Sequence, residues 1–326
     1  MLHVSTLEQF DIQLADFLTM LSALGLLFML VPAVLVTPGI ATITERLTFQ
    51  KHNAFYRKCA RQISQVPLGI GLMMFTIFGV GSIISLVHFR PDLVKPDMIW
   101  RPLIVITMPM AAMLLLSLYV VSWGILKKQR ALHLLLGAIA SLSCLVTFFL
   151  AFLFFVSLQR PIEPDVLLLQ PLAFFRILWK EFVSSPFLWL LTVYFLFLGI
   201  ASGTGFSQLW LIMRRYKDDY GRDYYNFAMR YCARLALIFT LLATATAGVL
   251  FLSLWRSMPS EFLQQQDGGI LLIAFGLPVS CCLLWLCILK SETPMRHKPG
   301  ALFACIFLFI SLCAQILFYL STFPML

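Results

Sequence analysis

Apolar residues fill eight long runs of the sequence, and the shorter stretches between them carry most of the charged side chains. The runs cover residues 14–43, 67–88, 102–126, 131–157, 187–213, 231–255, 269–290 and 299–324. An α-helix needs about 20 residues to cross a hydrocarbon core, and each run has about that length. Helices are expected because a segment in lipid must satisfy its own backbone hydrogen bonds. The pattern predicts an all-α integral membrane protein with eight transmembrane helices.

The distribution of positive charge predicts how these helices cross the membrane. Lys and Arg concentrate in the stretches that follow the first, third, fifth and seventh runs. The positive-inside rule places such stretches in the cytoplasm, so both termini are expected outside. The net charge of +9 follows this topology, which favours membrane lipids, and not nucleic acid, as the partner of the basic loops. We expect a multi-pass protein of the bacterial cytoplasmic membrane.

Two similar stretches suggest an internal duplication. NAFYRKCAR at 53–61 precedes the second run, and NFAMRYCAR at 226–234 precedes the sixth. The chain is therefore predicted to contain two four-helix units in tandem, 1–157 and 187–326. An even number of helices per unit makes the two units parallel and not inverted in topology. Chance similarity between two basic stretches is the alternative.

The connection between the units, 158–186, contains aromatic residues mixed with Arg176 and Lys180. This composition predicts an amphipathic helix that lies in the outer interface of the membrane, with Trp179 at headgroup depth. Anchoring in the interface is one role for such a helix. Covering a quinone pocket or docking a partner is the other.

Four motifs, in order along the chain, resemble the large subunit of cytochrome bd-type quinol oxidases. They are Val31-Pro32 followed by Glu45, the stretch GLMMFTIFG at 71–79, the run from Pro102 through Trp123-Gly124 to His133, and Ser185-Pro186 followed by Gly199 and Gly203. The resemblance implies two four-helix units with the N-terminus outside. It also implies a place in a quinone-linked respiratory complex.

The same comparison shows where this chain departs from that family. The positions implied for two haem-ligating histidines hold Leu27 and Tyr194, and those implied for carboxylates hold Phe75, Ile106 and Leu114. Leucine offers no lone pair to haem iron, and a tyrosine ligand needs to lose its proton. Proton delivery within a membrane usually relies on carboxylates. We therefore expect a divergent member of the family that binds no haem.

Polar residues near the outer end of the second run form one candidate site. His88 and Arg90 are candidates for hydrogen bonds to a quinone carbonyl, with Trp179 as a third member of this outer site. A contact with lipid headgroups is the alternative for His88. His133, at the inner end of the fourth run, is likewise expected to contact headgroups.

A second candidate site lies where the helices meet the cytoplasm. Glu45, Arg57, Arg61 and Arg234 are expected to form a charge cluster on the inner face, in which Arg234 pairs with Glu45 across the two units. Binding of anionic lipid by a surface cluster of this kind is the alternative. Neither metal ligands nor catalytic residues are predicted.

These features favour a cofactor-free membrane subunit of a quinone-linked respiratory electron-transfer complex. Such a subunit would form a hetero-oligomer with redox subunits that carry haem or iron–sulfur centres, and quinone is the one ligand expected. Two alternatives stay open. One is a haem-bearing cytochrome bd-like subunit with rearranged ligands, and the other is a transporter of an apolar substrate.

Overall fold

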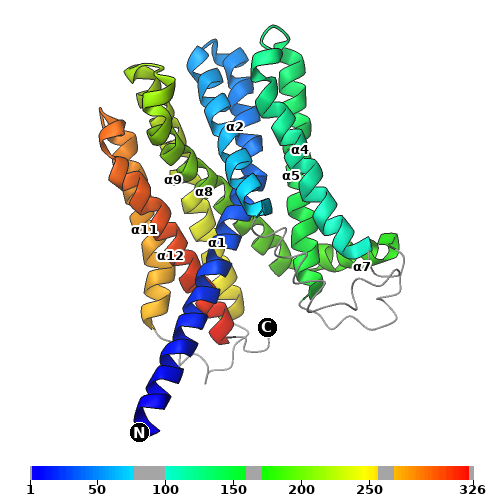
Figure 1. Cartoon of the computed structure of the whole chain (residues 1–326), viewed down its shortest axis with the longest axis vertical. Coiled ribbons are helices and arrows are strands. Elements are labelled where there is room, and N and C mark those ends of the chain that lie inside the picture. Colours follow the sequence, from blue (N-terminus) through cyan, green and yellow to red (C-terminus); the bar gives the residue numbers. More distant parts are fainter. Residues whose placement is uncertain (1, 77–99, 159–170, 256–267, 323–326) are drawn as a thin grey trace.

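The computed structural model describes residues 2–76, 100–158, 171–255 and 268–322 (Figure 1). Its helices are α1 (Leu2–Lys51), α2 (Ala54–Met74), α4 (Trp100–Ile125), α5 (Arg130–Leu158), α7 (Pro171–Ser184), α8 (Pro186–Asp218), α9 (Arg222–Trp255), α11 (Gly268–Lys290) and α12 (Lys298–Thr322), with a 3-10 turn at Pro294–Arg296. Within these ranges the chain forms helices and turns and no strand. The prediction of an all-α protein is confirmed.

Seven of the described helices are long and apolar enough to cross a membrane. They span Leu14–Lys51, Thr107–Ile125, Arg130–Leu153, Pro186–Asp218, Arg222–Ser253, Gly268–Lys290 and Lys298–Tyr319. The predicted segment 67–88 begins within α2, and its part from residue 77 onward lies outside the described residues. The chain is thus a multi-pass membrane protein, and the eighth crossing stays a prediction.

The short connections of the bundle gather at one end. Figure 1 shows the turns between α1 and α2, α4 and α5, α8 and α9, and α11 and α12 at this end, while α1 begins and α12 ends at the other. The turns carry the basic residues that the charge pattern places in the cytoplasm. We call their end the inner end and the opposite one the outer end, an orientation that rests on the charge rule alone.

The helix contacts repeat along the chain. In the first half, α1 packs against α2 and α5, and α4 packs against α2 and α5. The same four contacts recur in the second half, where α8 packs against α9 and α12, and α11 packs against α9 and α12. Helices α1 and α8 join the two halves by packing against each other.

Small residues bring α1 and α8 together. A Cβ atom added at Gly199 would lie 2.7 Å from the carbonyl oxygen of Pro32. The hydroxyl of Ser202 donates to the carbonyl oxygen of Leu198 at 2.7 Å, so this polar side chain needs no other partner at the contact. Close approach through small residues is how helices pack tightly in a membrane.

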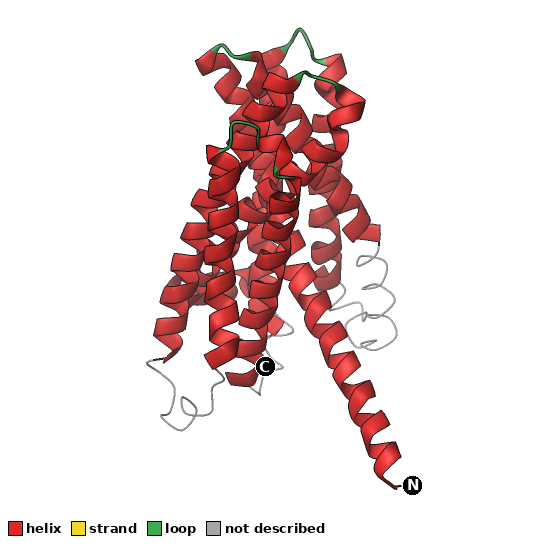
Figure 2. Cartoon of the chain, turned by 90° about the vertical axis from the view of Figure 1, so that its left-hand side faces the viewer, coloured by secondary structure: helices red, strands yellow, loops and turns green. Residues whose placement is uncertain are grey.

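Helix α1 is longer than the membrane requires. It has 50 residues, which corresponds to about 75 Å. Figure 2 shows its N-terminal part leaving the bundle at the outer end. The predicted run at 14–43 therefore covers only the apolar part of a longer helix.

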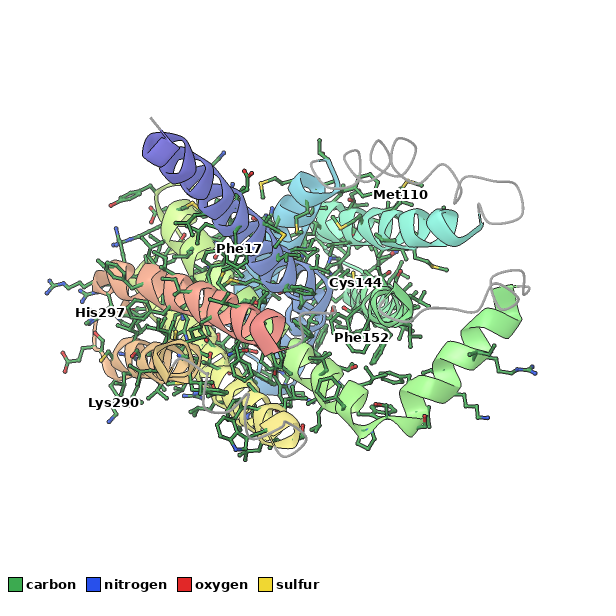
Figure 3. All side chains as sticks on the ribbon, turned by 90° about the horizontal axis from the view of Figure 1, so that it is seen from below. Phe17, Met110, Cys144, Phe152, Lys290 and His297 are labelled. Carbon is green, nitrogen blue, oxygen red and sulfur yellow. The ribbon has the colours of Figure 1, made fainter. Side chains whose placement is uncertain are left out.

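Helix α7 lies at the edge of the bundle, beside the outer ends of α5 and α8, and runs crosswise to the crossing helices (Figure 1). Seen from the outer end, it extends away from the bundle beyond α5 (Figure 3). Ser185 ends it and caps the next helix, because its side chain accepts from the N–H of Leu188 and Pro186 follows at the first helical position. A helix in this connection was predicted, and α7 places it at residues 171–184.

Candidate functional site

An apolar groove lies between α7 and the outer ends of α5 and α8. Its volume is about 430 Å³, within the range of small-molecule pockets. The lining residues are Val146, Phe149, Leu150 and Leu153 of α5, Trp179 and Phe182 of α7, and Trp189 of α8. We call this feature the outer groove.

Aromatic contacts hold α7 in place over the outer groove. Phe182 is fully buried, with its ring 4.5 Å from that of Trp189 and 6.1 Å from that of Phe152. The indole N–H of Trp189 donates to the carbonyl oxygen of Val183 at 3.4 Å. The groove is therefore formed by rings whose positions are fixed by packing, which suits a flat or chain-like apolar ligand.

The sequence placed three residues in an outer quinone site. Trp179 lines the outer groove and is half exposed, at 53%. His88 and Arg90 lie outside the described residues. The structure therefore connects only Trp179 with a pocket.

Tyr194, at the position that the resemblance implies for a haem ligand, takes part in a buried hydrogen-bond chain. Its hydroxyl donates to the side-chain oxygen of Gln315 at 2.6 Å. The amide nitrogen of Gln315 donates to the carbonyl oxygen of Ala274 at 3.2 Å, and the hydroxyl of Ser311 donates to the same oxygen at 2.7 Å. Tyr194 thus links α8 to α12, and through Ala274 to α11.

Pro278 explains why the Ala274 carbonyl accepts bonds from another helix. In an α-helix this carbonyl would accept from the N–H four residues later, and a proline at that position has none. A small cavity beside Pro278 and Tyr194 leaves room for about one water molecule. The hydroxyl of Thr240, which has no partner among the described residues, lines this cavity and can bond to such a water.

Leu27 occupies the other position that the resemblance implies for a haem ligand. It is partly buried and packs against the main core, which is the large cluster of buried side chains shared by both halves of the chain. Leu27 therefore contributes packing, and Tyr194 contributes a hydrogen bond. The residues present do not fit an iron ligand set, because leucine has no donor atom and the Tyr194 hydroxyl is bound to Gln315.

A buried histidine–glutamate pair is the main unexpected feature of the inner end. Nδ1 of His133 lies 2.6 Å from Oε1 of Glu45, and the Tyr119 hydroxyl donates to Oε2 of the same carboxylate at 2.9 Å. His133 and Glu45 are 3% and 4% exposed. The expectation that His133 contacts headgroups is wrong, because the first turn of α5 carries its side chain inward between α1 and α4.

The predicted pairing of Glu45 with Arg234 is also wrong. Glu45 faces His133 and Tyr119 inside the first half of the chain. Arg61 and Arg234 are exposed and Arg57 is half-buried. Because the Glu45 carboxylate faces the bundle interior, it does not join these cations in a cluster, and their contact with anionic lipid stays a prediction.

A second inner network joins the two halves of the chain, and sequence reasoning did not find it. The hydroxyl of Tyr224 in α9 donates to the side-chain oxygen of Gln62 in α2. The Gln62 amide donates to Asp218 at 2.8 Å, and Arg214 binds the same carboxylate through two nitrogens at 3.1 Å each. The one signal in the sequence was the Arg214–Asp218 spacing of four residues on a helix.

Neither the family models nor the curated proteins with which the sequence was compared match this chain.

Proposed function

We propose that this chain is a haem-free membrane subunit of a quinone-linked respiratory complex in the bacterial cytoplasmic membrane. It serves as a scaffold for redox subunits that carry haem or iron–sulfur centres. Its outer groove holds the isoprenoid tail of a quinone.

The observation that carries this proposal is the outer groove. Seven apolar residues line it, three of them aromatic rings on α7 and α8. A quinone has a long apolar tail, and a groove of this composition offers that tail a matching surface. Trp179 and Trp189 are both about half exposed, as expected for rings at the membrane interface.

The haem-free part of the proposal is supported by Tyr194 and Leu27. Tyr194 is 6% exposed and hydrogen-bonded to Gln315, so its oxygen has a structural partner. Electron transfer then depends on cofactors of other subunits. The quinone headgroup binds outside the groove, and His88 and Arg90 remain the candidates for holding it.

The test is to purify the protein with its native partners and to measure quinone per chain. Val146→Trp fills the outer groove and is expected to lower the bound quinone several-fold. Val249→Trp is the matched control, because Val249 on α9 is similarly exposed, at 49% against 44%. The proposal is wrong if the wild-type protein carries no quinone and no redox subunit, or if both variants retain quinone equally.

A further inference from the structure

A row of hydrogen-bonding side chains, called the file below, extends from the inner end into the first half of the bundle. It begins with His133 and Glu45 and continues to the Tyr119 hydroxyl. That hydroxyl lies beside Thr42, whose own hydroxyl is 2.9 Å from that of Ser141. Three helices, α1, α4 and α5, supply these groups.

The file starts close to the inner surface. The backbone N–H of His133 donates to the carbonyl oxygen of Gln129 in the turn between α4 and α5. His133 is therefore one helical turn from a connection at the inner end. Its side chain is nonetheless buried, so the imidazole lies just below the surface.

The hydrogen bonds determine what His133 can do. An ionised Glu45 can only accept, so the short contact makes Nδ1 of His133 the donor. In the neutral ring, Nε2 then carries a free lone pair. In the charged ring, Nε2 carries the second of the two ring protons. Nε2 is buried and has no partner among the described residues. A buried polar atom without a protein partner is unfavourable, so this nitrogen is free to bind a proton or to form a further hydrogen bond.

Two aromatic rings fix the orientation of the imidazole. The Trp123 ring centroid lies 4.2 Å from that of His133, and the Tyr119 centroid lies 4.8 Å away. An imidazole oriented by a carboxylate, with its other nitrogen unpaired, is the arrangement that proteins use to accept protons or bind ligands. Ionisable groups within a membrane bundle commonly mark such sites.

We propose that His133 and Glu45 form a proton-binding site that opens to the inner face. Nε2 of His133 takes a proton from water, and the resulting imidazolium is balanced by the Glu45 carboxylate. Release of the same proton restores the neutral ring. The Tyr119, Thr42 and Ser141 hydroxyls extend the file toward the middle of the membrane. This site rests on its own geometry and does not depend on the outer groove.

Few other charges act on this pair. Tyr119 and Trp123 face it from α4, and from α2 the Ser64 hydroxyl accepts from the Trp123 indole at 3.3 Å. Among the cations on the surrounding helices, Arg46, Arg61 and Arg130 are exposed, while Arg57 and Lys58 of α2 are half-buried. Water screens the exposed charges, so the Glu45 carboxylate in direct contact with the ring is the main charge acting on the imidazole.

The test is nitrogen NMR of the full-length protein in lipid nanodiscs with labelled histidine. His133→Gln identifies the His133 signals, and the exposed His52 and His297 serve as references. We expect the Nε2 signal of His133 to respond to pH, moving between the positions typical of an unprotonated and a protonated ring nitrogen. If His133→Gln does not fold, Glu45→Gln identifies the same signals, because it replaces the partner of Nδ1.

A second variant separates a proton site from a purely structural pair. Tyr119→Phe removes one donor to Glu45, which strengthens the attraction between the carboxylate and the imidazolium. The protonated form of His133 should then persist to higher pH than in the wild-type protein. Tyr216→Phe is the control, because Tyr216 is 83% exposed at the inner end. A His133 signal that does not change with pH, or equal midpoints in both variants, would overturn the proposal.

Discussion

The thiols of Cys59 and Cys232 lie beside each other where α2 packs against α9. Both are fully buried in the main core and neither is in a disulfide. Each is the first residue of a Cys-Ala-Arg triplet, and the two triplets were the sequence signal for an internal duplication. The similar stretches therefore meet in space, at the contact between the two halves of the chain.

This contact predicts energetic coupling between the two thiols. Cys59→Ala and Cys232→Ala should each lower the free energy of unfolding by about 1 kcal/mol. The double variant should lose less than the sum, by about 0.5 kcal/mol or more, because the residues touch. The measurement is thermal unfolding in nanodiscs. Cys144 packs in a separate cluster with Leu35, Ala112 and Phe148, so Cys59→Ala and Cys144→Ala should be additive.

The Tyr194 chain makes a prediction that involves Pro278. Gln315→Leu leaves the Tyr194 hydroxyl without its acceptor and removes one donor to Ala274, at an expected loss of about 2–4 kcal/mol. Pro278→Ala restores a backbone N–H to the Ala274 carbonyl. It should be nearly neutral alone, because that oxygen already accepts two bonds. In the double variant it should recover part of the loss. If the changes in unfolding temperature of the two single variants simply add up in the double variant, this account is contradicted.

The close approach of α1 and α8 predicts opposite effects at two glycines. Gly199→Ala places a methyl group against the Pro32 carbonyl, and a backbone atom cannot rotate away. We expect a loss of about 1–3 kcal/mol. Gly248→Ala in α9 meets no atom within 4 Å and should stabilise the helix by up to about 1 kcal/mol. Equal unfolding temperatures for the two variants would show that α1 and α8 do not pack as described.

The sequence predicted the crossing helices well, because apolar length is a local property. Seven of the expected runs coincide with described helices that are long enough to cross a membrane. The ends were less predictable. Helix α2 begins at Ala54, capped by Asn53, well before the apolar run at residue 67, because a helix continues through polar residues outside the lipid.

The inner site was not predictable, because it depends on which way a helix faces. Glu45 and His133 both lie at the inner ends of apolar runs, where surface and interior positions look alike in sequence. Their pairing joins residues far apart in the chain, and only the packing of α1 on α5 brings them together. Charge counting therefore underestimated the ionisable groups inside this bundle.

Tyr194 shows a similar limit. Its place in an apolar run suggested a replaced ligand, and the sequence contained Pro278, Ser311 and Gln315 as well. Nothing local connects these residues. The bond chain appears only when α8, α11 and α12 are packed together, since each bond crosses between helices.

The most direct test is the haem content of the purified complex, assigned to each subunit. A reduced-minus-oxidised optical spectrum with chemical haem quantitation on this chain gives the answer. The account predicts no stoichiometric haem on this chain, with any redox centres in the partner subunits. One haem per chain, with a spectrum altered by Tyr194→Phe, would contradict it.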